Sequence, residues 1–187
     1  MDKKRISKLI KSFSKSKILV LGDLMLDRYL WGNVERISPE APVPVVTVTK
    51  ETVNLGGAAN VAANVQALGA KVTLFGVIGN DPLAELFKEN LESYELQTSG
   101  LLVDPERPTT VKTRIVAHNQ QIVRIDRELS KEINSDLVDS MLSKIKKIIP
   151  KIDGIIISDY GKGVITYDLL TELISMANQA GLFIAVE

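Results

Sequence analysis

The segment Ile18-Leu19-Val20-Leu21-Gly22-Asp23-Leu24-Met25-Leu26-Asp27 sets the architecture that this sequence predicts. Its four leading apolar residues are typical of a strand that is buried on both faces of a parallel sheet. Gly22 and Asp23 follow at the carboxyl end of that strand, the edge where open α/β sheets bind their ligands. Asp27 adds a second carboxylate to the same rim. Two carboxylates accept hydrogen bonds from several hydroxyl groups, so they predict a polyol site rather than a metal site, with an ordinary turn as the alternative for Asp23.

Strand-like and helix-like segments alternate along the rest of the chain. A lysine-rich amphipathic helix is expected before residue 18, from the spacing of Ile6, Leu9, Ile10 and Phe13. Further strands are expected at 72–78, 154–158 and 182–186, and further helices at 55–70, after Asp81-Pro82, at 135–149 and at 166–180. This order predicts an α/β fold, a Rossmann-type parallel sheet with helices on both faces. A buried last strand would leave an apolar sheet edge, which either another chain covers or further chain continues, and we expect the second.

Two stretches, at about 29–54 and 108–127, do not fit that parallel sheet. The first contains three prolines and ends in β-branched residues. The second alternates apolar and polar residues over Val111–Ile115 and again after a turn predicted at Asn119-Gln120. We expect the two stretches to form a small β lid over the rim that carries the carboxylates.

The composition excludes several classes of protein. The 187 residues are 45% hydrophobic, which is enough for a substantial core. Lys and Arg number 23, as do Asp and Glu, and a net charge of zero argues against a nucleic-acid or membrane-surface protein. The absence of cysteine excludes disulfides and thiolate metal sites, and it fits a reducing cytoplasm. No signal-peptide pattern and no apolar run of roughly 20 residues is present, so we expect a soluble cytoplasmic protein.

Gly56-Gly57-Ala58-Ala59-Asn60 opens a segment, 55–70, that has no charged residue. We therefore expect a helix that is buried on most of its faces. Small residues at its start allow close packing of helix on strand without any ligand. The second glycine favours a ligand instead, because one glycine is usually enough for packing; Gly56, Gly57 and Asn60 are then candidates to bind hydroxyls or an anion. Neither a dinucleotide-binding nor a P-loop motif occurs.

A third rim segment, Asp159-Tyr160-Gly161-Lys162-Gly163, follows the predicted strand at 154–158. Lys162 is a candidate partner for an anionic substrate group or for a transferring phosphate, and a solvated lysine in a loop that leads into a helix is the alternative. Arg114 and Arg124 lie on the predicted lid, where charges are usually solvated. His118, the single histidine, has no partner motif and receives no role.

Five segments occur in order: Gly22–Tyr29, Arg36–Val45, Gly56–Ala62, Asn119–Arg124 and Ser158–Gly163. Together they resemble the ribokinase-like (PfkB) carbohydrate kinases, and among these the D-glycero-β-D-manno-heptose 7-phosphate kinases, which are often the N-terminal half of bifunctional proteins of ADP-heptose synthesis. The Gly-Gly-x-x-x-Asn element is typical of the whole family. The Arg36–Val45 and Asn119–Gln121 segments are far more specific to the heptose kinases.

The resemblance implies that residues 1–187 are the N-terminal portion of a sugar kinase domain with a β lid that often mediates dimerisation. It implies a sugar phosphate between sheet and lid, phosphorylated at its anomeric hydroxyl for lipopolysaccharide synthesis, with ATP and Mg²⁺ bound by a C-terminal half. The residues that it places at the sugar site are Asp23, Asp27, Gly56, Gly57, Asn60, Asn119, Gln121, Arg124, Asp159 and Lys162.

The sequence departs from the family in one large respect. The Gly-Ala-Gly-Asp signature, which supplies the family's catalytic base and anion hole, does not occur in these 187 residues. The resemblance therefore places the base beyond Glu187, and no residue of this chain is assigned as catalytic. Phosphoryl transfer depends on positioning and on charge around the transferred group, so we expect this chain to be truncated and inactive by itself. The alternatives are another sugar kinase of the family, ribokinase-like or fructokinase-like, or a non-catalytic fragment that binds sugar phosphate or dimerises.

Overall fold

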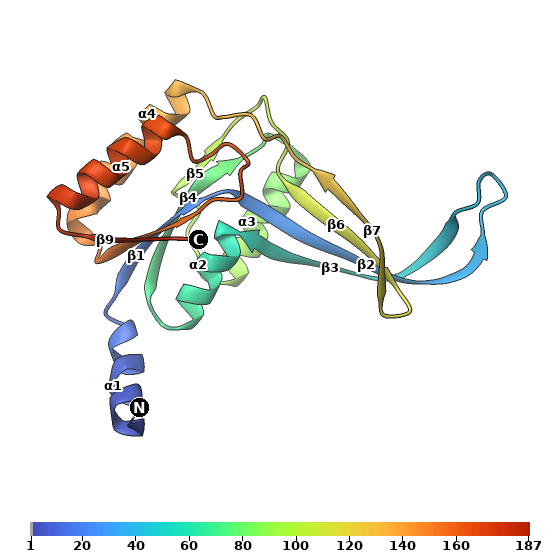
Figure 1. Ribbon diagram of the computed structural model, residues 1–187, viewed down its shortest axis with the longest axis horizontal. Helices are drawn as coiled ribbons and strands as arrows, with labels where there is room; N and C mark the ends of the chain where they lie inside the picture. Colours follow the sequence, from blue (N-terminus) through green and yellow to red (C-terminus); the bar gives the residue numbers. More distant parts are fainter. Residues whose placement is uncertain (1) are drawn as a thin grey trace.

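The computed structural model describes residues 2–187 and holds two β-sheets. The first is a five-stranded parallel sheet of order β5-β4-β1-β8-β9, and the second is a four-stranded sheet of order β3-β2-β6-β7. Figure 1 shows the parallel sheet inside the helical body and the second sheet extending away from it. The predicted α/β class, with a Rossmann-type sheet, is confirmed.

The parallel sheet is built around β1, because this strand pairs with β4 on one side and β8 on the other. Leu19, Val20 and Leu21 are completely buried in it, as a run of apolar residues in a central parallel strand should be. The strands of this sheet are β1 (Lys17–Gly22), β4 (Lys71–Ile78), β5 (Leu101–Val103), β8 (Gly154–Ser158) and β9 (Phe183–Val186).

Helices cover both faces of the parallel sheet and give it two apolar cores. α2 (Ala58–Ala67) and α3 (Pro82–Ser93) pack on the face that carries Val20 and Leu74. α4 (Ser135–Ile148), followed by the short 3-10 helix η1 (Ile149–Lys151), and α5 (Tyr167–Gln179) pack on the opposite face. Side chains cap α3 and α4, where Asp81 and Asn134 accept backbone N–H groups of the first turn.

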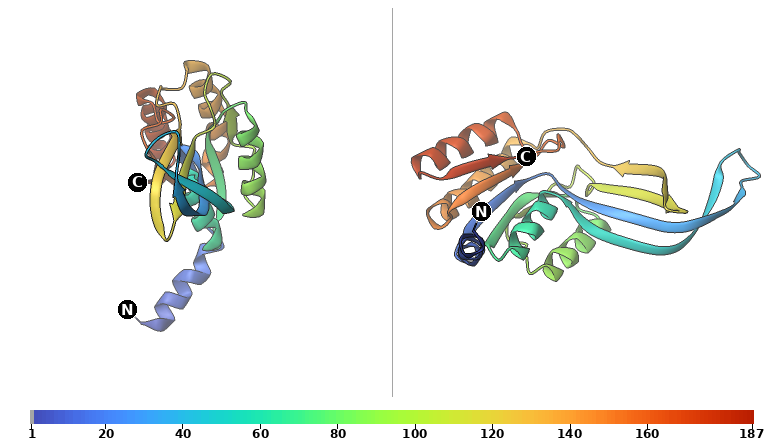
Figure 2. Two further views of the ribbon diagram at one scale, coloured as in Figure 1. Left: turned by 90° about the vertical axis from the view of Figure 1, so that its right-hand side faces the viewer. Right: turned by 60° about the horizontal axis from the view of Figure 1, so that its bottom comes forward.

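The second sheet, which we call the lid, begins directly at the rim. β2 (Leu24–Ile37) and β3 (Pro44–Gly57) form a long antiparallel ribbon, and β6 (Val111–Ala117) and β7 (Gln120–Arg127) extend it to four strands. Only Asp23 separates the end of β1 from the start of β2, so one continuous stretch of chain passes from the core into the lid. Figure 2 shows the lid as a curved arm beside the helical body. Both stretches that did not fit the parallel sheet lie in this lid.

α1 (Lys3–Phe13) is the predicted N-terminal amphipathic helix, and it projects away from the body in Figures 1 and 2. Ile6 and Phe13 are half-buried in it and Ile10 is exposed; the side chain of Leu9 lies outside the described residues. In the described part of the chain, no helix is both long enough and apolar enough to cross a membrane.

Three local expectations are wrong, and one short strand was not expected. Leu55, Gly56 and Gly57 belong to β3, and α2 buries only one face because Asn60 and Asn64 are exposed to solvent. The short strand β5 was not expected, because three residues give too little pattern. The lid hairpin turns at His118-Asn119, both with positive φ, which matches the twist of a two-residue turn. β9 is a largely exposed edge strand, not a buried one.

Candidate functional site

Asp23 departs most clearly from its expected role. Its side chain is buried, with 1% of the residue exposed. Oδ2 accepts the backbone N–H groups of Tyr160 at 2.8 Å and Lys162 at 3.0 Å, and Oδ1 accepts that of Val164 at 3.2 Å. A carboxylate surrounded in this way is closed to sugar hydroxyls. This corrects the prediction that Asp23 clamps the sugar: it holds the 159–164 loop in place from below.

The two glycines of the Gly-Gly pair each have a reason inside the protein. Gly57 has φ +55°, and a Cβ there would lie 2.3 Å from the carbonyl oxygen of Asp23. A Cβ on Gly56 would lie 2.6 Å from Oδ2 of Asp27. The pair therefore lets the chain turn into α2 and makes room for a carboxylate. The argument that two glycines indicate a ligand is not supported, although Gly56 does shape the space around Asp27.

Asp27 lies at the root of the lid, half-buried, and forms an ion pair with Arg114 of the neighbouring strand β6. The pKa of Arg114 is raised, first by its hydrogen bond to Asp27. The guanidinium also lies 5.3 Å from the ring centroid of Tyr29, which in turn stacks on Trp31 at 5.6 Å. Asp27, Tyr29, Trp31 and Arg114 thus occupy one face of the lid, which we call the polar face.

Lys162 is fixed at the rim through its main chain. Its N–H binds Asp23, and its carbonyl oxygen accepts Nη1 of Arg107 at 3.3 Å. Arg107 is 8% exposed, pairs with the buried Asp104 at 2.9 Å, and also donates to the carbonyl oxygen of Lys131. Two buried ionic groups, Asp23 and Arg107, therefore hold the Lys162 backbone from opposite sides, while its side chain extends toward the lid.

The Lys162 ammonium meets a lid carboxylate that the sequence did not single out. Nζ of Lys162 lies 2.8 Å from Oε1 of Glu128, and Nζ of Lys112 lies 3.2 Å from Oε2 of the same carboxylate. The pKa of Glu128 is lowered, first because Lys162 donates a hydrogen bond to it and also because Lys112 does. Lys112 contacts Asp126 as well, at 3.3 Å. This row of charges joins lid to body.

The remaining predicted residues lie at differing distances from this junction. Asp159 is exposed at the rim, and its Oδ1 accepts the N–H of Gly161 at 2.9 Å. Asn60 is exposed in the first turn of α2, where its Oδ1 accepts Nδ2 of Asn64 at 3.4 Å. Asn119 and Gln121 lie at the turn between β6 and β7, and Figure 1 shows this hairpin extending away from the body.

Glu187, beyond which the catalytic base is expected, lies beside the rim loop that follows β8. Its backbone N–H donates to the carbonyl oxygen of Ile157 at 2.9 Å, and its carbonyl oxygen accepts the N–H of Asp159 at 3.2 Å. Its Oε1 accepts the hydroxyl of Tyr160 at 3.5 Å, and the pKa of Tyr160 is raised, first by burial and then by the charge of Glu187. These contacts make Glu187 an exposed support of the loop, so we do not assign it as the base. A base beyond it stays a prediction.

Arg124 lies half-way along the hairpin strand β7, about half exposed, and pairs with Asp126 at 3.0 Å. It stands directly opposite Arg114, and two like charges at such a position repel unless carboxylates compensate them. Asp27 and Asp126 provide that compensation. The structure thus brings Asp27, Asp159 and Lys162 to one junction of rim and lid, and it leaves Asn119 and Gln121 outside.

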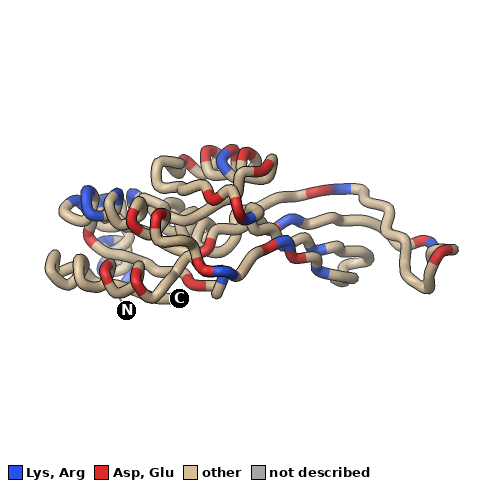
Figure 3. Tube along the Cα trace, turned by 90° about the horizontal axis from the view of Figure 1, so that it is seen from above, with Lys and Arg blue, Asp and Glu red and all other residues tan. Residues whose placement is uncertain are grey.

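Sequence reasoning missed three features of this junction, namely Lys112, Glu128 and the role of Arg114. The alternation in Val111-Lys112-Thr113-Arg114-Ile115 does place Lys112 and Arg114 on one face, but solvated charges show the same pattern. Figure 3 shows acidic and basic residues interleaved where the lid meets the body. Only the strand order, with β6 beside β2, reveals that these charges face each other.

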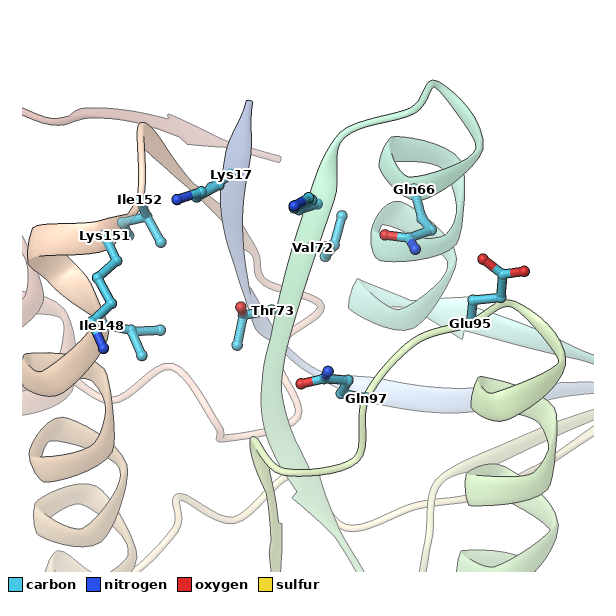
Figure 4. A pocket seen from close by; sticks show the side chains of 10 residues that line it. Lys17, Gln66, Val72, Thr73, Glu95, Gln97, Ile148, Lys151 and Ile152 are labelled. Atoms are coloured by element: carbon cyan, nitrogen blue, oxygen red, sulfur yellow. The ribbon is translucent and has the colours of Figure 1, made fainter. Parts of the chain in front are cut away.

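A separate hollow of about 380 Å³ lies at the opposite end of the parallel strands from the rim (Figure 4). Lys17 and Lys71, which begin β1 and β4, line it together with Lys151, Gln66 and Gln97. These are the amino ends of parallel strands, whereas ligands of open α/β sheets bind at the carboxyl ends. The rim–lid junction is therefore the better candidate site.

The donor groups for a metal ion do not assemble in the described residues 2–187. No group of three or more histidine or acidic side chains there is placed to hold one. Asp23 and Glu128 are already engaged by N–H groups and ammonium groups. The described residues thus do not fit a protein-held Mg²⁺ ion, and we derive no step through one.

Comparison with known proteins places this site in context. A model of the pfkB family carbohydrate kinases matches residues 15–186. The bifunctional protein HldE of Helicobacter pylori strain HPAG1 is 54% identical over 163 residues, which is 87% of this chain and 35% of that protein. HldE of Desulfatibacillum aliphaticivorans is 49% identical over 175 residues, which is 94% of this chain and 36% of that protein. The chain spans about a third of the length of these curated relatives.

Solved structures agree in fold. A carbohydrate kinase from Agrobacterium tumefaciens superimposes with a TM-score of 0.68 at 22% identity, over 91% of this chain and 53% of that one. A ribokinase from Arabidopsis thaliana, determined with ribose and ATP, gives a TM-score of 0.63 at 14% identity, over 91% of this chain and 52% of that one. At such identities the likeness shows the architecture alone.

Proposed function

This chain belongs to the pfkB family of carbohydrate kinases, and we propose that its rim–lid junction binds the sugar phosphate substrate of a heptose 7-phosphate kinase. In the complete reaction, the anomeric hydroxyl of D-glycero-β-D-manno-heptose 7-phosphate would be phosphorylated to the 1,7-bisphosphate, for ADP-heptose and lipopolysaccharide synthesis. The identity of about 50% to HldE proteins supports this substrate over those of other kinases in the family.

One observation carries the proposal: the loop that carries Lys162 meets the lid through Glu128, which also binds Lys112, at the carboxyl ends of the parallel strands. Strand register places Asp27 of the polar face beside Lys112. A sugar phosphate needs acceptors for its hydroxyls and cations for its phosphate, and both are present. Asp27 is the acceptor, and its ion pair with Arg114 holds the carboxylate in position. Lys162 and Lys112 are the cations, and Arg124 adds charge along the same face.

The other predicted residues have supporting parts in this proposal. Asp159 and Asn60 are exposed polar groups at the rim and first helical turn, where they are available to hydroxyls. Gly56 and Gly57 shape the floor, and Asp23 holds the Lys162 loop. Asn119 and Gln121 lie at the hairpin tip, so we assign them to a contact made by the lid and not to direct binding of the sugar.

These 187 residues contain no Gly-Ala-Gly-Asp stretch, and we propose that they bind sugar phosphate without transferring a phosphoryl group to it. ATP is the phosphoryl donor in the complete kinase, and no residue described here is assigned to it. The chain's own contribution is to orient the sugar: Asp27 accepts hydrogen bonds from its hydroxyls, the lysines neutralise the phosphate, and the lid shields both from water.

Calorimetry with heptose 7-phosphate and with unphosphorylated heptose, beside an assay of ADP release, tests the proposal. We expect binding of the phosphorylated sugar, weaker binding of the neutral one, and no ADP release by this chain. Equal affinity for ribose, fructose and heptose phosphates would favour another kinase of the family. No binding of any sugar would overturn the proposal.

The outer face of the lid supports a second part of the proposal, that the chain forms a homodimer through its lid. Register places Leu30 beside Ile115, and Ile115 beside Val123. Val123 and Ile125 are about half exposed there. An exposed apolar sheet face is typical of an association surface. Light scattering on the chain and on an Ile125→Lys variant would test it: a dimer that becomes monomeric is the expected result.

A further inference from the structure

Glu128 stands where two lysines from different parts of the fold converge. Lys112 comes from strand β6 of the lid, and Lys162 comes from the loop after β8 of the body. Each lysine binds a different oxygen of the carboxylate, at 3.2 Å and 2.8 Å. All three side chains keep a minor part of their surface in water, between 14% and 23%. The pair of ammonium groups thus forms a partly exposed cradle that is filled by Glu128.

The charges around the cradle leave an excess of positive charge. The connected row consists of Arg124, Asp126, Lys112, Glu128 and Lys162, which is three cations against two carboxylates. A carboxylate supplies one negative charge and two oxygens to the cradle. A phosphate monoester supplies close to two charges and three oxygens, so it fits two ammonium groups better than Glu128 does.

We propose that Glu128 is an internal counter-ion that occupies the phosphate position of the site, and that the phosphate of the substrate displaces it from Lys112 and Lys162. This inference rests on the proposed function for the identity of the ligand. Glu128 then also selects among ligands. An anion must compete with the tethered carboxylate for Lys112 and Lys162, so weakly charged sugars do not displace it.

The surroundings allow such an exchange. The backbone of Lys162 is held by Asp23 and Arg107, so its ammonium group can change partner without movement of the loop. Glu128 follows the last residue of β7, and its side chain contacts these two lysines. Its lowered pKa keeps it ionised at neutral pH, so it competes as a full charge.

A counter-ion and a purely structural salt bridge predict opposite changes in phosphate affinity when Glu128 is replaced. If Glu128 merely holds the lysines in position, its neutral isostere Glu128→Gln should bind phosphate more weakly than the wild type or equally well. If Glu128 competes with the ligand, Glu128→Gln should bind phosphate and heptose 7-phosphate more tightly, by roughly threefold to tenfold, while the affinity for neutral heptose is unchanged.

The experiment is calorimetry of the full 187-residue chain with inorganic phosphate, heptose 7-phosphate and heptose, at fixed ionic strength. Glu51→Gln is the matched control, because Glu51 also loses a charge from an ion pair, with Arg28 at 2.7 Å. Adding Lys112→Met to the Glu128→Gln variant should remove the increase in affinity for phosphate and heptose 7-phosphate. Glu128→Ala serves as a second variant and should show the same increase in phosphate affinity.

The outcomes of this experiment distinguish a failure of the counter-ion inference from a failure of the proposed function. A gain for inorganic phosphate in Glu128→Gln without any sugar binding would support the counter-ion and overturn the sugar site. Binding of heptose 7-phosphate by the wild type with no gain, or a loss, in both Glu128 variants would overturn the counter-ion and leave the function standing. A gain of the same size in Glu51→Gln would show a general charge effect and would also overturn it.

Discussion

The carboxylate of Asp23 lies beneath Lys162 and receives its backbone N–H at 3.0 Å, although 139 positions separate the two residues in the chain. This contact connects the end of β1 to the loop after β8. It makes Asp23 a structural anchor, whereas Asp27, four residues further on, keeps its carboxylate at the surface of the site. The two acids of one short motif therefore have different roles, and replacing each of them should have a different effect.

Replacing Asp23 by Ala should destabilise the fold rather than remove a sugar contact. Three backbone N–H groups would lose their acceptor inside the protein, and we expect a loss of about 3 kcal/mol in the free energy of unfolding. Urea denaturation followed by circular dichroism measures it. Asp159→Ala, an exposed rim acid, is the control and should cost less than about 1 kcal/mol. An Asp23→Ala protein as stable as the wild type would contradict the anchor role.

Replacing Asp27 by Asn should affect binding more than stability. The ion pair with Arg114 is partly exposed, so its loss should change the free energy of unfolding by less than about 1 kcal/mol. Loss of the charged acceptor should weaken heptose and heptose 7-phosphate alike, by roughly tenfold. Calorimetry with both sugars provides the measurement. Unchanged affinity for both would exclude Asp27 from the hydroxyl site.

Replacing Lys162 by Ala should discriminate between ligands. The lost ammonium group contacts the phosphate in our proposal, so heptose 7-phosphate should lose roughly tenfold in affinity and heptose almost nothing. Calorimetry with the two sugars measures both changes, and Lys147→Ala, an exposed lysine on α4, is the control variant. If the two sugars lose affinity equally, Lys162 does not bind the phosphate.

Gly57→Ala should be much more harmful than Gly181→Ala, although both glycines have positive φ. At Gly181, with φ +68°, no atom lies within 4 Å of the added Cβ, so the cost is the left-handed backbone, about 1–2 kcal/mol. At Gly57 the Cβ would also lie 2.3 Å from a backbone oxygen of Asp23. We expect Gly57→Ala to lose at least about 3 kcal/mol or to fail to fold. Thermal unfolding of both variants decides, and equal losses would contradict the close packing.

The stabilising effect of Glu128 should depend on pH. Its pKa lies below the usual value of 4.5, first because of the hydrogen bond from Lys162 and then because of the one from Lys112, which together outweigh burial. A lowered native pKa means that this stability is present above about pH 4.5 and is lost as the pH falls through the native value.

The measurement compares the free energy of unfolding of the wild type and Glu128→Gln between about pH 7 and pH 3. The wild type should be more stable by about 1 kcal/mol at neutral pH, and the difference should shrink toward the acid end of the range. A difference that stays constant over that range would show that the ion pairs with the two lysines do not contribute.

The sequence by itself determined most of the architecture. Apolar runs such as Ile18–Leu21, which a parallel sheet requires to be buried on both faces, located the central strands. Local chemistry also located the helix starts after Asp81 and at Ser135, because a cap depends only on a side chain and the next three residues. These features are encoded within a few residues of each other, so a single sequence is enough to recognise them.

Only the tertiary structure decided what each charged residue does. The pairings of Asp23 with Lys162, Asp27 with Arg114, and Lys112 and Lys162 with Glu128 join residues far apart in the chain. The Lys112–Glu128 pair lies at the base of the predicted β6–β7 hairpin, but the others depend on β6 pairing with β2 and on β8 pairing with β1, and no local pattern encodes those strand partners. A carboxylate in the sequence is compatible with an anchor, a clamp or a counter-ion, because burial and the nearest opposite charge, which the fold alone provides, select among them.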